Sequence, residues 1–302
     1  MLITLKTGSN MAQIESRGAE LRSLRDAFNT EYIWQRDPKY WGKSSPVLFP
    51  VVGELREGRT TFHGKEYHLP KHGFCRDAEF KVTYQSESMA IFNYTYNEET
   101  LKAYPYKFSL SLSYELKPEG LTIRYTVMNM DDQPIDFCLG AHPAFNVPVD
   151  GNGGFEDCAL TFNMPETAGC PVFDFEKKQF DMDNRVTYLN NETTLRLKYS
   201  YFDNDAIFFD TPRSDRVRLA SVKTGRGVII GGTVRGVEVQ FGGFDYVAFW
   251  TPIGLEAPFL CIEPWCGVAV CSDEGDEFER KRGVKHLEIG EQKSFQLTIL
   301  PL

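Results

Sequence analysis

The stretch FSLSLSYELKPEGLTIRYTV, residues 108–127, decides the fold class. From Phe108 to Leu116 every second residue is Phe, Leu or Tyr, and Ser or Glu lies between. Residues 121–127 repeat this alternation with Leu, Ile, Tyr and Val. An apolar period of two is typical of a strand with one buried face, and Pro118-Glu119-Gly120 supplies a turn. The stretch therefore predicts a hairpin of two antiparallel strands.

Further short strand candidates follow toward the end of the chain, separated by Gly, Asp or Arg. They are Val217–Val222, Gly227–Gly231, Val237–Phe241, Tyr246–Thr251 and Ser294–Leu300. The helical exception is Glu98–Tyr104, a turn and a half that Pro105 should end. Many short strands without strand–helix alternation predict an all-β protein, a large antiparallel β-sandwich. Asp150–Gly154 is interpreted as a surface loop within a single domain spanning residues 1–302.

Composition narrows the classes of partner. The 302 residues carry 33 basic and 42 acidic side chains, a net charge of −9, which argues against nucleic-acid or anionic-membrane partners. The acidity also argues mildly against a heavily phosphorylated substrate. No apolar stretch approaches the roughly 18 residues of a membrane span, and the first ten residues lack a signal-peptide pattern. Seven cysteines, an odd number, favour reduced thiols in a cytoplasmic protein.

Three segments surround an ionisable side chain with Pro or Gly: LPKHGFCRD (69–77), LGAHPAFN (139–146) and LCIEPWCG (260–267). His142 and Glu263 each precede a proline, which favours an extended backbone and a defined side-chain direction. Glu263 stands in an apolar run, where a carboxylate is costly unless it is paired. Partial burial would raise the pKa of Glu263 toward the range of a general base.

Metal binding is a second chemical interpretation of these residues. Two histidines and one carboxylate, His72, His142 and Glu263, suit zinc or iron. The sequence offers no HxxH or HxH pair, however, and the five-residue spacings of Cys261, Cys266 and Cys271 are not those of a zinc knuckle. We therefore expect no metal and no other cofactor.

These segments also carry a resemblance. Five strings occur in order along the chain: SPVLFP with Gly53 (45–53), HGF with Arg76-Asp77 (72–77), GAHPAF (140–145), DNDA (203–206) and CIEPW (261–265). In these strings the sequence resembles the aldose 1-epimerase (galactose mutarotase-like) family, and within it the LacX-like bacterial branch. The resemblance covers essentially the whole chain. It implies the galactose mutarotase-like β-supersandwich and metal-free acid–base chemistry on a small-molecule sugar.

The resemblance also implies roles for single residues. Glu263 would take the proton from the anomeric O1 hydroxyl, and His142 would donate a proton to the ring oxygen. His72 would hydrogen-bond near the ring oxygen, Asp205 would hold sugar hydroxyls, and Arg76 would orient the substrate or Glu263. A bell-shaped pH dependence would then report Glu263 on its acid limb and His142 on its basic limb.

Several assignments stay open within this picture. Relatives place a basic residue where this chain has Glu54, so Arg56 is a candidate replacement for that substrate contact. Asp203 and Asp210 compete with Asp205 for the hydroxyl-binding role. Trp250 and Trp265 are candidate surfaces for stacking against the sugar, or else core residues.

Three functions fit the sequence. The first is a mutarotase that interconverts the α and β anomers of a free aldose. The second is a hexose-6-phosphate 1-epimerase, which would need Lys71, Arg76 and Arg56 to converge on the phosphate. The third is a non-catalytic sugar-binding or regulatory protein, although a binder needs no acid–base pair. The chain is expected to act as a monomer or a homodimer.

Overall fold

The hairpin expected at residues 108–127 lies inside the largest sheet of the computed structural model, which describes residues 1–149, 151, 153–222 and 235–302. This sheet has nine described strands. In spatial order they are β15 (Gln179–Arg196), β14 (Cys158–Asp174), β17 (Arg216–Ser221), β18 (Gly236–Gln240), β22 (Gln292–Pro301), β10 (Gly120–Asn129), β9 (Phe108–Lys117), β8 (Met89–Thr95) and β7 (Lys81–Gln85).

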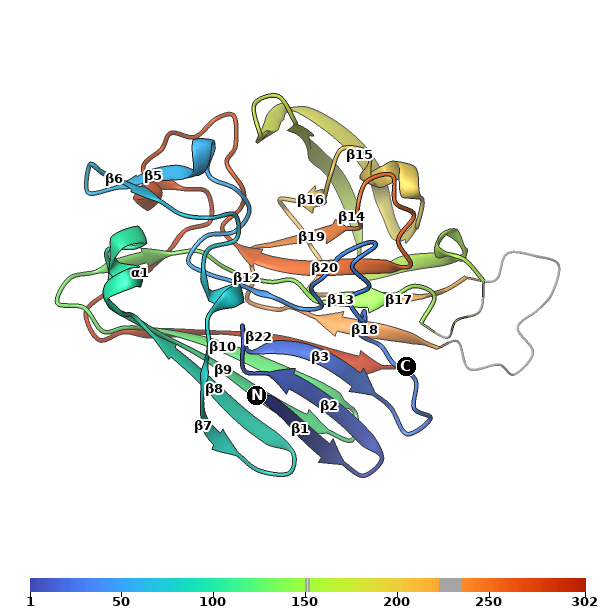
Figure 1. Cartoon of the computed structure of the whole chain (residues 1–302). Coiled ribbons are helices and arrows are strands. Elements are labelled where there is room, and N and C mark those ends of the chain that lie inside the picture. Colours follow the sequence, from blue (N-terminus) through green and yellow to red (C-terminus); the bar gives the residue numbers. More distant parts are fainter. Residues whose placement is uncertain (150, 152, 223–234) are drawn as a thin grey trace.

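A second sheet of six described strands lies over the nine-stranded sheet (Figure 1). It contains β16 (Ile207–Phe209), β19 (Tyr246–Trp250), β20 (Phe259–Cys266), β12 (Leu139–Ala141) and β4 (Val47–Leu48), with β13 (Ala144–Asn146) paired to β20. The N-terminal strands β1 (Leu2–Thr7), β2 (Asn10–Glu15) and β3 (Glu20–Arg25) form a three-stranded sheet beside β9. The paired strands are antiparallel, so the all-β antiparallel sandwich expected from the sequence is confirmed.

The remaining elements are short. Two-stranded pairs join β11 (Ile135–Phe137) with β21 (Lys285–Leu287) and β5 (Arg59–Phe62) with β6 (Lys65–His68). The helices are α1 (Glu98–Ala103) and the 3₁₀ turns η1 (Arg56–Gly58), η2 (Cys75–Asp77), η3 (Phe155–Asp157), η4 (Tyr199–Phe202) and η5 (Phe278–Arg280). None of the described helices has the length and apolarity that a membrane crossing requires.

The alternation along β9 becomes its burial pattern. Its apolar residues are buried and the intervening Ser and Glu residues are partly exposed. Lys117 pairs with Gly120, so Pro118 and Glu119 form the turn of the hairpin. At Gly120 a side chain would not fit, because a Cβ atom would lie 2.2 Å from the carbonyl oxygen of Ile299 on β22. The turn glycine thus lets the neighbouring strand approach.

The expected strands near residues 217, 237, 246 and 294 are present as β17, β18, β19 and β22, and α1 occupies the expected helix. The candidate Gly227–Gly231 lies outside the described residues. One hydrophobic cluster extends from Ile3 to Ile299 and fills the space between the sheets. Aromatic rings connect the layers. The ring centroids of Phe49, beside β4, and Phe108 are 4.9 Å apart, and those of Phe249 on β19 and Phe162 on β14 are 5.7 Å apart.

Candidate active site

Glu263 occupies the middle of β20, a central strand of the six-stranded sheet. It pairs with Ala248 of β19, and its side chain is 2% exposed. Apart from Glu263 the strand consists of apolar residues and cysteines, and all of it is buried, as such a run indicates. A carboxyl group is therefore held in the interior, where only a specific partner offsets its lost hydration.

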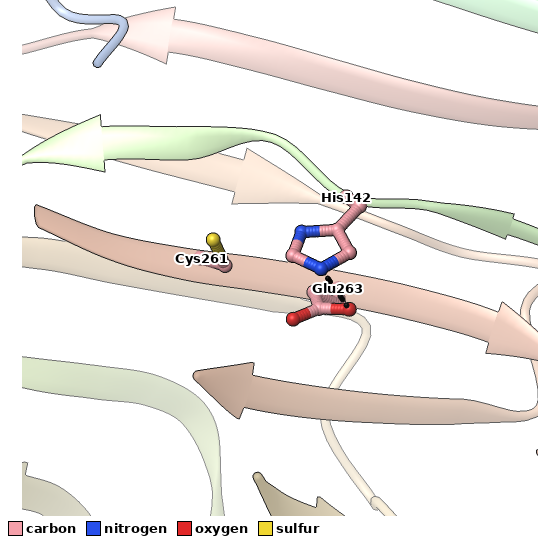
Figure 2. A group of neighbouring side chains, drawn as sticks. All are labelled: His142, Cys261 and Glu263. Carbon is pink, nitrogen blue, oxygen red and sulfur yellow. Dashed lines mark ion pairs between the residues drawn. The ribbon is translucent and has the colours of Figure 1, made fainter. Parts of the chain in front are cut away.

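His142 supplies that partner. It lies between β12 and β13, which both pair with β20: Gly140 faces Trp265 and Ala144 faces Cys261. The residues His142 and Pro143 therefore lie beside β20 at the level of Glu263. The imidazole Nε2 is 3.2 Å from the carboxyl Oε2 (Figure 2). The Glu263 side chain leaves the extended backbone of β20, and His142 lies between the ends of two short strands.

Burial shifts the pKa values of Glu263 and His142 in opposite directions. It raises the pKa of Glu263 well above its usual 4.5, and the nearby Asp205 carboxylate adds to the rise. It lowers the pKa of His142 from 6.5 to about 3, with a further lowering by Arg76. Over a wide pH range the pair therefore holds one proton in total, shared across the contact between Nε2 and Oε2.

His72 is held as a neutral hydrogen-bond donor. The backbone N–H of Gly53 donates to its Nδ1 at 3.1 Å, so the ring proton must be on Nε2. Burial lowers the pKa of His72 well below 6.5, and His142 lowers it further. Gly53 has a φ of +70°, and a Cβ there would lie 2.4 Å from the Cβ of Ala269. Only glycine fits the backbone position that sets this tautomer.

Asp205 is the aspartate that reaches the site. It lies in the turn after η4 with a φ of +68°, and its Oδ1 accepts a hydrogen bond of 2.9 Å from Trp250 Nε1. Asp210 is instead paired with Arg185 at 2.7 Å, and Asp203 is exposed. Trp250 thus orients Asp205, and its ring also lies 5.8 Å from His142.

These side chains line one cavity of about 300 Å³. His72, Arg76, His142, Asp205, Trp250 and Glu263 are all in its wall, together with Lys71, Glu54 and Trp265. Six of the seven site residues expected from the sequence are therefore brought together. A cavity of this size is at the lower end of those that take small organic ligands.

Arg56 is the exception, because the structure does not place it among the residues of this cavity wall. Its guanidinium lies 3.1 Å from Asp276 Oδ1 and also donates to the carbonyl oxygens of Glu274 and Cys271. These acceptors lie in the loop at residues 271–276, which is not part of the cavity wall. They take up the hydrogen-bond donors of the Arg56 guanidinium. Glu54, two residues earlier, does line the cavity, as does Arg76.

Trp41 is a site residue that sequence reasoning missed. Its ring stacks on His142 with centroids 4.9 Å apart and an angle of 24°, and its edge contacts Trp250. Trp34 fixes the segment by donating from Nε1 to the Trp41 carbonyl at 2.9 Å. Stacking restricts rotation of the imidazole and favours its protonated form through a cation–π interaction. No local motif marks Trp41, because its role depends on contacts distant in sequence.

Phe173 and Phe180, at the paired ends of β14 and β15, complete the wall from another direction. Their rings lie 5.4 Å apart, and Phe180 also packs 5.0 Å from Phe208. The aromatic-rich segment 173–180 is the sequence feature that could have indicated this wall. Nothing in the local sequence, however, shows that this hairpin reaches the site.

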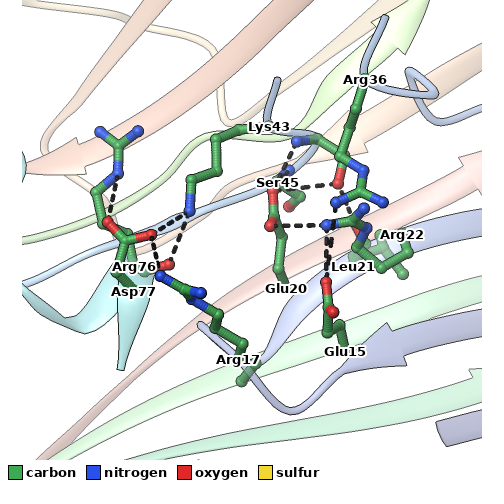
Figure 3. Close-up of polar contacts among 12 residues, drawn as sticks. Glu15, Arg17, Glu20, Leu21, Arg22, Arg36, Lys43, Ser45, Arg76 and Asp77 are labelled. Carbon is green, nitrogen blue, oxygen red and sulfur yellow. Dashed lines mark hydrogen bonds and ion pairs between the residues drawn. The ribbon is translucent and has the colours of Figure 1, made fainter. Parts of the chain in front are cut away.

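A network of polar contacts joins the segment that carries Arg76 to Lys43 and the residues next to it (Figure 3). Lys43 Nζ donates to the Arg76 carbonyl at 3.1 Å and pairs with Asp77 at 2.6 Å. Nearby, the buried Glu20 carboxylate accepts from the backbone N–H groups of Ser44 and Ser45 at 2.6 and 3.1 Å. The backbone next to Trp41 and Arg76 is thereby fixed.

Glu20→Ala is expected to lower the free energy of unfolding by about 3 kcal/mol, since it leaves Arg22 and two buried N–H groups without this acceptor. Glu20 is 2% exposed, and Arg22 Nη1 lies 3.2 Å from its Oε2. Urea denaturation measures the change. Glu115→Ala, which removes a half-exposed carboxylate paired with Lys117, serves as control and should cost under about 0.5 kcal/mol. Equal effects of the two substitutions would contradict the anchoring role.

The family model for aldose 1-epimerase matches residues 1–279 of the chain. This chain belongs to the aldose 1-epimerase family. Two relatives from Lactococcus lactis subsp. lactis, the plasmid and chromosomal proteins LacX, are 33% and 32% identical over 99% of this chain and 100% of their own length. The LacX-like branch inferred from the sequence strings is confirmed.

Solved structures agree with this aldose 1-epimerase membership. A galactose mutarotase related enzyme from Lactobacillus acidophilus superposes with a TM-score of 0.90 at 29% identity, covering 100% of this chain and 97% of that one. A galactose mutarotase-like protein from Lactobacillus casei gives 0.88 at 29% identity and covers all of both chains. The fold is therefore that of the galactose mutarotase-like proteins.

Proposed function

We propose that this family member is a mutarotase, which interconverts the α and β anomers of a free aldose by opening and reclosing the sugar ring. The observation that carries the proposal is the buried pair of His142 Nε2 and Glu263 Oε2, 3.2 Å apart in the wall of a sugar-sized cavity. Anomerisation needs one base and one acid at the two oxygens of a single carbon, and no redox centre. Adjacent groups suit that requirement, because O1 and the ring oxygen are both bonded to C1.

The reactive form has Glu263 ionised and His142 protonated. Transfer of the shared proton across the 3.2 Å contact reaches it from the neutral pair. Lys71 and Arg76 lower the pKa of Glu263 and so favour its ionised carboxylate, although they lower the pKa of His142 as well. Glu263 then accepts the O1 proton while His142 gives its proton to the ring oxygen. The C1–O5 bond breaks as C1=O1 forms, and the pair is left neutral.

The open-chain aldehyde then rotates about C1–C2, and the 5-hydroxyl oxygen attacks the other face of the carbonyl. His142 takes back the hydroxyl proton and Glu263 returns a proton to O1, so that atoms and charges balance. His72 Nε2–H supplies a hydrogen bond to the ring-oxygen region. Asp205, oriented by Trp250, accepts from sugar hydroxyls, and Arg76 orients the substrate.

Mutarotation of a panel of free aldoses, followed by polarimetry, tests the proposal. At least one aldose should reach anomeric equilibrium faster in proportion to protein concentration. No acceleration for any of them, with binding detected by calorimetry, would instead support the non-catalytic sugar-binding alternative.

One observation favours a sugar phosphate as a second candidate substrate. Lys71 and Arg76 both line the cavity, as that alternative requires. Glu54 and Asp205 line it as well and would repel a phosphate, while Arg56 lies elsewhere. We therefore favour the neutral sugar. Comparing glucose with glucose 6-phosphate at equal concentration distinguishes the two, and a higher kcat/KM for the phosphate would reverse the preference.

The pH dependence of kcat/KM should show a broad plateau rather than a narrow maximum. The pair gains a second proton only near the His142 pKa of about 3 and loses its last only above the raised pKa of Glu263. The acid limb therefore reports His142 and the basic limb Glu263, opposite to the assignment from sequence. Initial rates between about pH 4 and 9, corrected for the enzyme-free rate, should therefore stay on the plateau. A maximum confined between the ordinary values of 4.5 and 6.5 would contradict it.

Chelation should leave the activity intact, because the acid–base pair supplies each proton transfer by itself. Overnight treatment with EDTA, followed by dialysis and assay, is expected to give a rate within about twofold of the untreated protein. A lost activity that returns with Zn²⁺ or Mn²⁺ would show that a metal carries part of the chemistry. Mock-dialysed protein is the control.

A further inference from the structure

A third side chain lies beside the proposed catalytic pair. His142, Cys261 and Glu263 are the group of three potential metal ligands found among the described residues, and one donor atom from each lies within 4.8 Å of the others (Figure 2). Cys261 and Glu263 are two residues apart on β20, so both side chains point to the same face of the sheet. All three are at least nine-tenths buried.

Nε2 is the His142 ring nitrogen that can join this group, because it lies 3.2 Å from Glu263 Oε2. Among the described residues the buried Nδ1 has no hydrogen-bond partner, so no contact on the other side of the ring opposes a small rotation. Figure 2 shows one ring nitrogen directed at the Glu263 carboxyl, with the Cys261 thiol to the side of the ring. An imidazole, a thiol and a carboxyl group within 4.8 Å of one another are the ligand types of tetrahedral zinc.

The distances suit such an ion after a small adjustment. Metal–ligand bonds of about 2.0 Å to nitrogen or oxygen and about 2.3 Å to sulfur place tetrahedral ligand atoms about 3.3–3.7 Å apart. The Nε2–Oε2 distance of 3.2 Å already meets this value. The sulfur is within 4.8 Å of its partners and would need to move by roughly 1 Å, which a change of side-chain torsion supplies.

We propose that this group binds a thiophilic divalent cation of the zinc class, and that the bound ion inhibits the enzyme. His142, Cys261 and Glu263 would be its ligands, with the fourth position open to the cavity. On binding, the metal forms bonds to Cys261 Sγ, His142 Nε2 and a Glu263 carboxylate oxygen, and two protons leave to solvent, one from the thiol and one that the His142–Glu263 pair had shared. The ion would occupy the atoms that hold the shared proton, so ring opening would stop. The metal binding goes beyond the proposed function, and only the inhibition rests on it.

Cys261 makes the proposal testable without disturbing the chemistry. It is absent from the cavity wall and has no step in ring opening. Cys266 is a matched control, because it is another buried cysteine on β20 but is an odd number of residues from Glu263, on the opposite face of the sheet.

Cd²⁺ serves as a spectroscopic probe that needs no turnover. Titration of the chelator-treated protein should produce the ultraviolet thiolate-to-cadmium charge-transfer band. The band should persist in Cys266→Ser and disappear in Cys261→Ser and in Cys261→Ala, the second variant guarding against a folding defect of the first. Absence of the band from the wild type, or its persistence without Cys261, would overturn the proposal.

Inhibition is measured on the same proteins with Zn²⁺. The wild type and Cys266→Ser should lose anomerisation activity together. Cys261→Ser should keep its basal activity and need at least about 10-fold more Zn²⁺ for the same loss. Equal Zn²⁺ sensitivity of the two serine variants would place the inhibitory ion elsewhere and refute the assignment. If no sugar is anomerised at all, the proposed function fails while the Cd²⁺ result still decides the metal site.

Discussion

Glu263→Gln should reduce the rate of anomerisation by a factor on the order of 10² to 10⁴, the usual contribution of a general acid–base group. The amide preserves the shape of the side chain in the buried strand but can neither accept nor return the O1 proton. It also cannot share a proton with His142 Nε2, which lies 3.2 Å from the carboxyl in the native protein. The loss should therefore appear in kcat more than in KM.

Two controls separate chemistry from folding. Because an amide is cheaper to bury than a carboxyl group, the melting temperature of Glu263→Gln should not fall. Glu54→Gln alters another carboxyl group of the cavity wall that has no proton-transfer role, and it should cost less than about 10-fold. An activity of Glu263→Gln within about threefold of wild type would remove Glu263 from the mechanism.

His142→Asn should likewise lower kcat by about 10² or more, whereas His72→Asn should mainly raise KM. His142 shares the mobile proton with Glu263, and Asn can hydrogen-bond but cannot carry that proton. His72 has its Nδ1 occupied by the Gly53 N–H at 3.1 Å and acts as a neutral donor. A hydrogen bond to the sugar that is present before and during ring opening contributes to binding more than to the chemical step.

Steady-state kinetics of both variants on the same aldose provide the comparison. A larger loss of kcat in His72→Asn, together with a mainly raised KM in His142→Asn, would exchange the roles of the two histidines. Preserved circular dichroism spectra should accompany either outcome.

Much of the fold was predictable because its central strands are regular. The alternation in β9 and β10 is unbroken, and their pairing has no register shift. The long hairpin of β14 and β15 escaped prediction for the opposite reason. Its pairing shifts register at several places, including the step from Thr161 to Glu166, and each bulge moves side chains to the other face. No period of two survives in that part of the sequence.

The candidate site shows the same division. His72, His142 and Glu263 were found because Pro or Gly beside an ionisable residue is a local signal. Trp41 carries no such signal, since its stacking on His142 joins segments about a hundred residues apart. Arg56 was chosen because it is close in sequence to cavity residues, but its guanidinium is bound to Asp276 and not placed in the cavity wall.

In the proposed mechanism the buried pair of His142 and Glu263 exchanges the anomers of a free sugar. Magnetisation-transfer NMR on an aldose at anomeric equilibrium measures this exchange directly, through the resolved α and β anomeric protons. We predict that catalytic amounts of the wild-type protein make saturation of one proton diminish the other, and that Glu263→Gln leaves the exchange at the protein-free rate. Two results would contradict this mechanism. One is exchange that stays at the protein-free rate with the wild type for every aldose tested, and the other is exchange with Glu263→Gln that is as fast as with the wild type.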